Sequence, residues 1–221
     1  MNAILVMPSQ ADSYQREIKQ TINTIIDDVI GSLPEPKNLS SAEKRGIIAR
    51  YSAVLEGNFI YWMTAALIAV QSEEARQILL GNLYEEVRDA HPDMLRRFAI
   101  AAKAFPTDTD ALAVHDDLRK VRLFLGKLSS VQSILTMAFF EGFIQRFMGY
   151  LADLAAAQGS SEMEYTDVHG VCDIEHTEGL FRALALEMAI NPPATEQDLF
   201  EGVFLLQTLM QTVIIGNTVA A

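Results

Sequence analysis

Three ionisable side chains share one face of a helix predicted over about residues 166–189. His169, Asp173 and His176 are spaced i, i+4 and i+7, so at about 100° per residue they lie within roughly 60° of one another. The same face continues with Leu180 and Leu184, so we expect it to pack inward. Two imidazoles and a carboxylate are good ligands for Fe, Mn or Zn. The alternatives are an aspartate that orients two core histidines, and a face exposed to solvent.

A single carboxylate interrupts the apolar face of the helix predicted over about residues 130–157. Glu141 shares this face with Ile134, Met137, Ile144 and Met148. An unpaired carboxylate inside a core costs several kcal/mol or stays protonated. Glu141 is therefore expected to bind a metal, to pair with an arginine or lysine, or to reach water.

The segment NLYEE, followed by His91 and Pro92, supplies a further acid and a further imidazole. On an unbroken helix Glu86 and His91 point roughly 140° apart. Proline disfavours helical backbone at the residue before it, so we predict a break at His91 that turns the imidazole back toward Glu86. The alternative is a solvated acidic helix end. His115, in the sequence HDDL, is predicted to lie on the surface.

Three histidines and three carboxylates from separate helices thus form one candidate metal-ligand set. The set consists of Glu86, His91, Glu141, His169, Asp173 and His176. Bridging carboxylates and terminal imidazoles suit two iron or manganese ions in the core of a helical bundle. Zinc is an alternative, but a carboxylate-rich set with open positions suits an ion that binds O2.

Helical spacing of apolar residues runs through the chain, and no segment shows the sustained alternation of a strand. Helix-start signals include the Ser40–Glu43 capping box, Ser72 and Thr195. Loops are short, and neither a linker nor a fixed-period repeat is evident. We therefore predict an all-α bundle of seven to eight helices that forms a single domain over residues 1–221. The predicted helices cover about 10–31, 40–70, 72–90, 92–104, 109–127, 129–157, 166–189 and 195–215.

Composition narrows the class of protein. The 221 residues are 50% hydrophobic, and 17 Lys and Arg against 29 Asp and Glu give a net charge of −12. Such a chain lacks the basic footprint of a nucleic-acid or anionic-membrane binder. The most apolar stretch, about Phe59–Val70, is too short to span a bilayer, and the N-terminus does not read as a signal peptide. The single cysteine favours a reducing compartment, so we expect a cytoplasmic protein without nucleic-acid or membrane partners.

In their order, these motifs resemble those of the heme-oxygenase-like diiron oxidases and oxygenases, which share their fold with the TenA-like thiaminases and the PqqC-like quinone synthases. The family pattern is Asn-Leu-x-acid-Glu followed by His, a Glu on a central helix, and a later His-x3-Asp-x2-His. The matching elements span about residues 80–176: NLYEE with His91, Glu141 in FFEGF, and HGVCDIEH. The resemblance implies that Glu86 and His91 bind one metal ion, with Glu86 as the ligand rather than Glu85. It also implies that Glu141 and the histidines and aspartate of HGVCDIEH complete the pair of metal sites. Several relatives carry a glycine-containing insertion between the Glu86 and His91 positions.

The resemblance also implies O2 chemistry. Two reduced iron ions, with manganese as the alternative, would activate O2 to oxidise a small carboxylate-bearing substrate, an amino acid or a fatty acid, in a biosynthetic pathway. An external electron donor is an expected partner. Tyr165 is a candidate pocket residue, with ordinary packing as its alternative, and Trp62 and Tyr61 are candidates for pocket wall or core. A carboxylate clamp would come from one of four arginines, namely Arg50, Arg97, Arg146 and Arg182.

Two other functions remain open from the sequence. A metal-free enzyme on the same scaffold would be either a TenA-like hydrolase with a cysteine nucleophile or a PqqC-like oxidase with a basic pocket. Cys172 lies inside the ligand motif rather than on another helix, which counts against the hydrolase. The second is a non-catalytic helical interaction protein, because fold does not decide function. A homodimer is also expected from the apolar final helix, with Phe204, Leu205, Leu209, Val213 and Ile214.

Overall fold

The computed structural model describes residues 8–193 and 195–216, and every regular element in this part of the chain is helical. The all-α prediction is therefore confirmed. These residues form eight helices when α2 and α3 are counted as one interrupted helix. The elements are α1 (Pro8–Gly31), the 3-10 turn η1 (Pro36–Asn38), α2 (Ser41–Leu55), α3 (Asn58–Ala69), α4 (Glu73–Arg88), α5 (His91–Ala101), α6 (Asp108–Leu125), α7 (Ser130–Ala157), α8 (Glu164–Ile190) and α9 (Glu196–Ile215).

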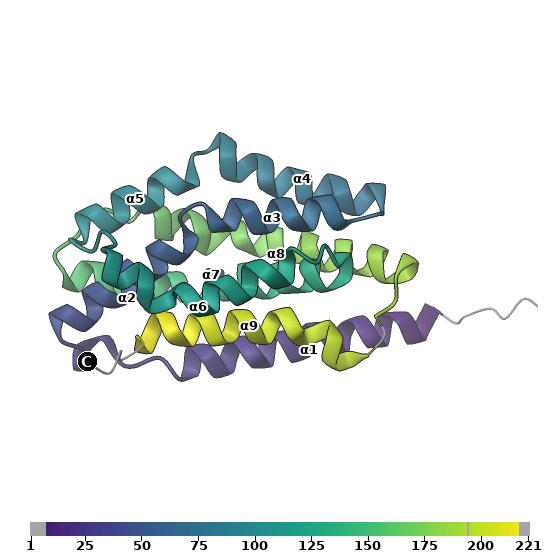
Figure 1. The fold of residues 1–221 in the computed structure, drawn as a ribbon, viewed down its shortest axis with the longest axis horizontal. Coiled ribbons are helices and arrows are strands. Elements are labelled where there is room, and N and C mark those ends of the chain that lie inside the picture. Colours follow the sequence, from purple (N-terminus) through teal and green to yellow (C-terminus); the bar gives the residue numbers. More distant parts are fainter. Residues whose placement is uncertain (1–7, 194, 217–221) are drawn as a thin grey trace, which may run out of the picture.

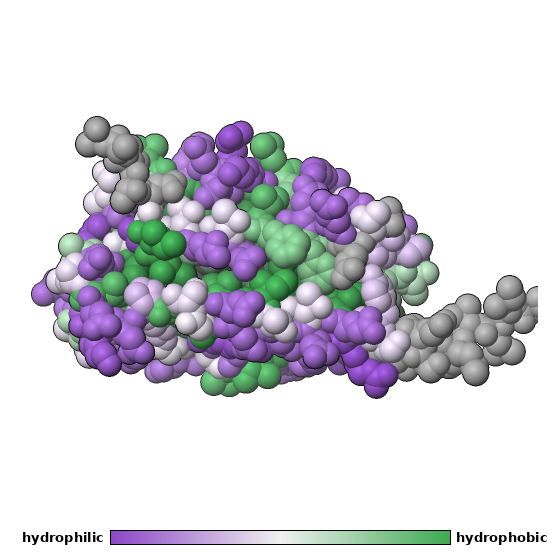
Figure 2. All heavy atoms as spheres, turned by 90° about the horizontal axis from the view of Figure 1, so that it is seen from below, coloured by the Kyte–Doolittle hydropathy of each residue, from purple (hydrophilic) through white to green (hydrophobic). Residues whose placement is uncertain are grey.

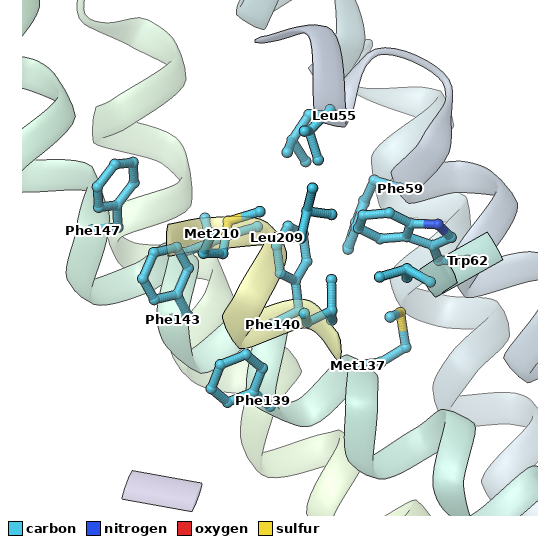
Figure 3. Packing of buried hydrophobic residues seen from close by; sticks show 14 of the residues in the cluster. Leu55, Phe59, Trp62, Met137, Phe139, Phe140, Phe143, Phe147, Leu209 and Met210 are labelled. Atoms are coloured by element: carbon cyan, nitrogen blue, oxygen red, sulfur yellow. The ribbon is translucent and has the colours of Figure 1, made fainter. Parts of the chain in front are cut away.

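The helix α7 is the centre of the bundle. It packs against α8 along much of its length and also contacts α1, α2, α3 and α9, with α1 and α9 along one side and α4 and α5 along the other (Figure 1). A helix that is apolar all round is expected to be buried. Four phenylalanines of α7 accordingly lie in the core with Trp62 of α3 (Figure 3), namely Phe139, Phe140, Phe143 and Phe147.

Predicted start signals coincide with the helix starts. Ser40 and Glu43 form the capping box of α2, because the Ser40 side chain accepts from the Glu43 backbone N–H and Glu43 accepts from the Ser40 N–H. Ser72 and Thr195 cap α4 and α9 in the same way through their side-chain oxygens. Side-chain caps satisfy backbone donors that have no partner inside the helix.

The single helix predicted over 40–70 is wrong in one respect, because the chain is interrupted between α2 and α3. Gly57 has a φ of 75°, a left-handed conformation that glycine adopts without steric cost. The apolar spacing continues across this turn, and for that reason it does not show up in the sequence pattern. The turn changes the direction of α3 relative to α2 (Figure 1).

The predicted break beside Pro92 is confirmed. Helix α4 ends at Arg88 and α5 begins at His91, with Pro92 in the first turn of the new helix, a position proline favours. Ala90 takes the left-handed conformation, with φ of 57°, which costs a non-glycine residue about 1 kcal/mol. Helices α4 and α5 consequently meet at a distinct angle (Figure 1).

Two helical segments, Ser41–Ala69 and Gln197–Ile215, are long and apolar enough to cross a membrane. About half of the apolar window in each is buried inside the protein, 50% and 56% respectively. Core helices pass the same test, so it is weak evidence for a membrane. The absence of a membrane partner stays a prediction.

The final helix buries most of the surface on which the homodimer prediction rests. Leu209, Val213 and Ile214 pack inside the same chain, whereas Phe204 is 49% exposed. On the face of the molecule that carries α1 and α9, hydrophobic side chains gather between hydrophilic ones (Figure 2). The homodimer stays a prediction.

Candidate metal centre

All six side chains predicted as metal ligands are buried. Their exposed fractions are at most 5%: 3% for Glu86, 4% for His91, 1% for Glu141, 4% for His169, 0% for Asp173 and 5% for His176. Charged residues are almost never fully buried unless they are paired or bind a metal. His115 of α6, in contrast, is exposed as predicted.

Glu86, His91 and His169 form the first of two groups. Nδ1 of His91 lies 2.8 Å from Oε1 of Glu86, and Nε2 of His169 lies 3.9 Å from the same oxygen. Potential ligand atoms of all three residues lie within 4.8 Å of one another. The break at Ala90 therefore turns the His91 imidazole back toward Glu86, as predicted from the sequence.

The backbone orients His169. Its Nδ1–H donates to the carbonyl oxygen of Tyr165 at 2.8 Å, which leaves Nε2 directed at Glu86. Burial, together with the charge of His91, lowers the pKa of His169 to about 4. A neutral imidazole with a free Nε2 lone pair is the form that binds metal ions.

Asp173 and His176 form the second group, together with Glu141 of α7. Nδ1 of His176 lies 3.7 Å from Oδ1 of Asp173 and 3.8 Å from Oε2 of Glu141. One atom of each residue is buried without a hydrogen-bond partner: Oε1 of Glu141, Oδ2 of Asp173 and Nδ1 of His176. Buried polar atoms without partners are costly, and a bound cation would satisfy all three.

Glu141 connects the two groups. It lines a narrow cavity of about 20 Å³ together with Glu86, His91 and His169, and it also lies beside His176. The other described residues around this cavity are Leu55, Phe59, Ile60, Pro92, Leu95, Ile144 and Tyr165. The three distant motifs therefore converge on one buried place with largely apolar walls.

Glu85 is a neighbour of the centre that the sequence reasoning missed. Its Oε2 lies 3.0 Å from Nε2 of His176, whereas Glu86 faces His91 and His169. Adjacent residues on a helix point about 100° apart, so the two acids of NLYEE serve different groups. Burial lowers the pKa of His176, but Glu141 and Glu85 outweigh it and raise this pKa to about 9.

Burial also changes the pKa values of Asp173 and Glu86. Burial and the nearby charge of Glu141 raise the pKa of Asp173 well above its usual range. Burial also raises the pKa of Glu86, and the hydrogen bond from His91 offsets this only in part. Without a cation the centre therefore holds protons in its place, and a bound metal would displace them.

Tyr165 lines the cavity. This is one of the two alternatives predicted for it; the other is ordinary packing. Its ring lies 4.2 Å from that of His169, and its hydroxyl is 2.8 Å from the hydroxyl of Tyr51. Burial raises the pKa of both phenols, so they stay protonated. Trp62 belongs to the core and Tyr61 is 40% exposed, and neither is among the residues that line the cavity.

Cys172 lies beside the second group. Its Sγ–H donates to Oδ1 of Asp173 at 3.2 Å, and its sulfur lies within 4.8 Å of ligand atoms of Asp173 and His176. Burial and the charge of Asp173 raise the pKa of the thiol. A protonated thiol is a poor nucleophile.

The arginines expected to clamp a carboxylate lie elsewhere. Arg50 donates to the carbonyls of Val213 and Ile214 near the end of α9. Arg97 and Arg146 pair with surface carboxylates. Arg182 lines a separate hollow between α1 and α8. Among the described residues that line the cavity at the candidate centre, there is no lysine or arginine.

The helical fold of the described residues and the buried histidine–carboxylate set are typical of helical bundles that hold metal ions in their core. The family model described as iron-containing redox enzyme matches residues 49–209, which include all six predicted ligands. The chain belongs to this family. No curated protein matches it. Family and buried cluster together point to iron as the metal.

Proposed function

We propose that this protein is a non-heme diiron oxidase or oxygenase that uses O2 to oxidise a small substrate. The supporting observation is the position of Glu141, which borders one buried histidine–carboxylate group and approaches the other. One carboxylate between two such groups is the arrangement in which a pair of iron ions is held in helical bundles.

In this proposal the first group, Glu86, His91 and His169, holds one ion. Asp173 and His176 hold the second, and Glu141 lies between them. Two reduced iron ions, or manganese ions in their place, would supply the electrons for O2 activation when bound to these residues. The orphaned atoms of the second group support this assignment, as do the raised pKa values of Asp173 and His176.

The surrounding residues orient ligands and exclude water. The Tyr165 carbonyl holds the His169 ring so that Nε2 faces the centre, and Glu85 holds Nε2 of His176 so that Nδ1 faces Asp173 and Glu141. Hydrogen bonds of this kind fix the imidazole tautomer and ring orientation. Leu55, Phe59 and Ile144 give the cavity dry walls.

The proposed substrate is a small carboxylate-bearing molecule of a biosynthetic pathway. Walls without a lysine or arginine among the described lining residues favour a substrate that presents a hydrocarbon chain. Both candidate classes, a fatty acid and an amino acid, carry a carboxylate that would need a polar partner outside these walls. An external electron donor would return the metal to its reduced state.

Anaerobic loading with Fe(II), followed by exposure to O2, tests the proposal. We expect close to two Fe per chain in the wild type, fewer in Glu141→Ala and His176→Ala, and no change in His115→Ala, the exposed control. A visible absorption whose decay one fatty or amino acid accelerates would identify the substrate class. Equal iron content in wild type and Glu141→Ala would overturn the proposal.

The metal-free alternatives predict other results. A TenA-like hydrolase would lose activity in Cys172→Ser and ignore chelators, although the raised pKa of the Cys172 thiol argues against a nucleophile. A PqqC-like oxidase would oxidise its substrate with O2 in metal-free protein. A non-catalytic interaction protein would show neither metal-dependent absorption nor turnover.

A further inference from the structure

Glu187 of α8 is a completely buried carboxylate outside the candidate metal centre. Its exposed fraction is 0%. Its Oε1 accepts hydrogen bonds from the backbone N–H groups of Gln71 and Ser72, at 2.7 and 2.6 Å. These two residues immediately precede α4, so a carboxylate of α8 holds the N-terminal end of α4. This geometry resembles a helix cap, because backbone N–H groups at the start of a helix need acceptors from outside it.

Helix α4 lies antiparallel against α8, and the contact of Glu187 is one of several close approaches between them. In the middle, α8 has a glycine where α4 comes near: a Cβ on Gly179 would lie 3.1 Å from Cγ2 of Ile78. At the other end is the contact between His176 and Glu85. Along α8 the pairs run in opposite order to α4: His176 with Glu85, Gly179 with Ile78, and Glu187 with Ser72.

Few side chains of α4 are fully buried. They are Ala75, Leu79, Asn82 and Glu86, and the partly buried Ile78 and Leu83 also pack against the core. Most helices in proteins owe their position to the packing of an apolar face. The hydrogen bonds from Gln71 and Ser72 to Glu187 add a directional contact that helps to fix the height of α4 along α8.

We propose that Glu187 is a positioning residue of the metal centre: by anchoring the start of α4 on α8, it sets where Glu86 stands relative to His169. This inference rests on the proposed function. Ser72 and Glu86 are about 21 Å apart along one continuous helix, so a shift at the anchor moves the ligand. A slip of one residue displaces Glu86 by about 1.5 Å, whereas metal–ligand distances tolerate about 0.2 Å.

Three variants and one control test the anchor in the full-length protein. Glu187→Ala removes the acceptor, Glu187→Gln keeps a carbonyl oxygen for both N–H groups, and Glu187→Asp shortens the side chain by one methylene. Asp110→Ala is the matched control, because Asp110 is also buried and accepts from a backbone N–H at a helix start, but on α6, which carries no candidate ligand. The measurements are Co(II) affinity by anaerobic titration and amide hydrogen exchange of residues 73–88 in metal-free protein.

We expect Glu187→Ala to speed exchange throughout α4 and to weaken Co(II) binding 10-fold or more, the size of effect seen for residues that orient ligands. Glu187→Gln is expected to stay within 3-fold of wild type, Glu187→Asp to lie between, and Asp110→Ala to lose stability but keep Co(II) affinity within 3-fold. If Glu187→Ala does not fold, the comparison of Glu187→Asp with Glu187→Gln decides.

Wild-type affinity in both Glu187→Ala and Glu187→Asp, or a loss of affinity in Asp110→Ala as large as that in Glu187→Ala, would overturn the anchor. Failure of the proposed function has a different signature. In that case the wild type itself binds no Co(II), while the exchange rates of α4 in metal-free protein still report whether Glu187 holds the helix.

Discussion

Oε2 of Glu141 lies 3.8 Å from Nδ1 of His176, although the two residues are on different helices. Within the described part of the chain, neither that nitrogen nor the other oxygen of Glu141 has a hydrogen-bond partner. Both side chains are nearly inaccessible to solvent. Such an arrangement is costly for an empty protein core and favourable around a cation.

Metal loading is expected to stabilise the protein strongly. A ligand bound at 100 times its dissociation constant adds about 2.7 kcal/mol, and for a chain of this size each kcal/mol raises the Tm by about 2–4 °C. We therefore expect the Tm of the iron-loaded protein to exceed that of chelator-treated protein by about 5–10 °C, measured anaerobically by scanning calorimetry. Identical midpoints would contradict a metal centre, and Glu141→Ala should remove most of the difference.

Metal-free protein is expected to lose stability as the pH rises from about 6.5 to 9. The pKa of His176 is raised from 6.5 to about 9 in the folded state, so folding favours the protonated form and this contribution disappears as the proton is lost. The raised pKa values of Asp173 and Glu86 act in the same direction. The contribution of His176 is at most about 3 kcal/mol.

Urea unfolding at pH 6.5, 7.5 and 9 checks this dependence. His176→Asn is expected to flatten the profile, and His115→Asn, which changes an exposed histidine, is expected to leave it unchanged. Iron-loaded protein should show little dependence, because the metal has replaced the proton. A stability that rises between pH 6.5 and 9 in metal-free wild type would contradict the electrostatics of the centre.

Removal of Glu85 is expected to weaken metal binding without removing a ligand. Its Oε2 lies 3.0 Å from Nε2 of His176 and thereby keeps Nδ1 free for the metal. Loss of such an orienting partner costs about 10–100-fold in metal affinity. We expect this loss in Glu85→Ala, measured by Co(II) titration, and wild-type affinity in the control Glu73→Ala. The control residue lies on the same helix but contacts Gln77 and Arg76 at the surface.

Leu95 is expected to control the size of the substrate. Its buried side chain lines the cavity at the candidate centre and also a second small hollow between α2 and α5. Leu95→Ala should join the two spaces, lower the free energy of unfolding by about 2–5 kcal/mol and shift turnover toward bulkier substrates. Leu151→Ala, a buried position in α7 away from the cavity, should destabilise equally and leave the substrate preference unchanged. The same shift of substrate preference in Leu95→Ala and Leu151→Ala would contradict a specific role of Leu95.

The positions of the helices and of most candidate ligands could be predicted because they depend on residues close together in the sequence. Caps such as Ser40 and Ser72 mark helix starts through hydrogen bonds within three residues. Pro92 marks the break that brings His91 back to Glu86. The spacing of His169, Asp173 and His176 places them on one buried face, because a helix has a fixed angle per residue.

Other features depended on partners far away in sequence. Gly57 interrupts a stretch of continuous helical spacing of apolar residues. The interruption is evident in the left-handed backbone of Gly57 and not in the spacing. The approach of Glu85 to His176 and the hold of Glu187 on Ser72 join α4 to α8. No feature of the sequence distinguishes the four arginines as candidates for a carboxylate clamp. The fold places all four away from the residues that line the cavity.

The sequence by itself determined an acidic, helical chain and predicted six candidate metal ligands, because apolar periodicity indicates which side chains turn inward. The tertiary structure alone decided how those residues divide between two groups, that Glu141 stands between them, and that Glu187 holds the helix of Glu86. The physical reason is that coordination needs agreement within fractions of an ångström between separate helices, and the relative height and rotation of packed helices come from contacts across the whole bundle.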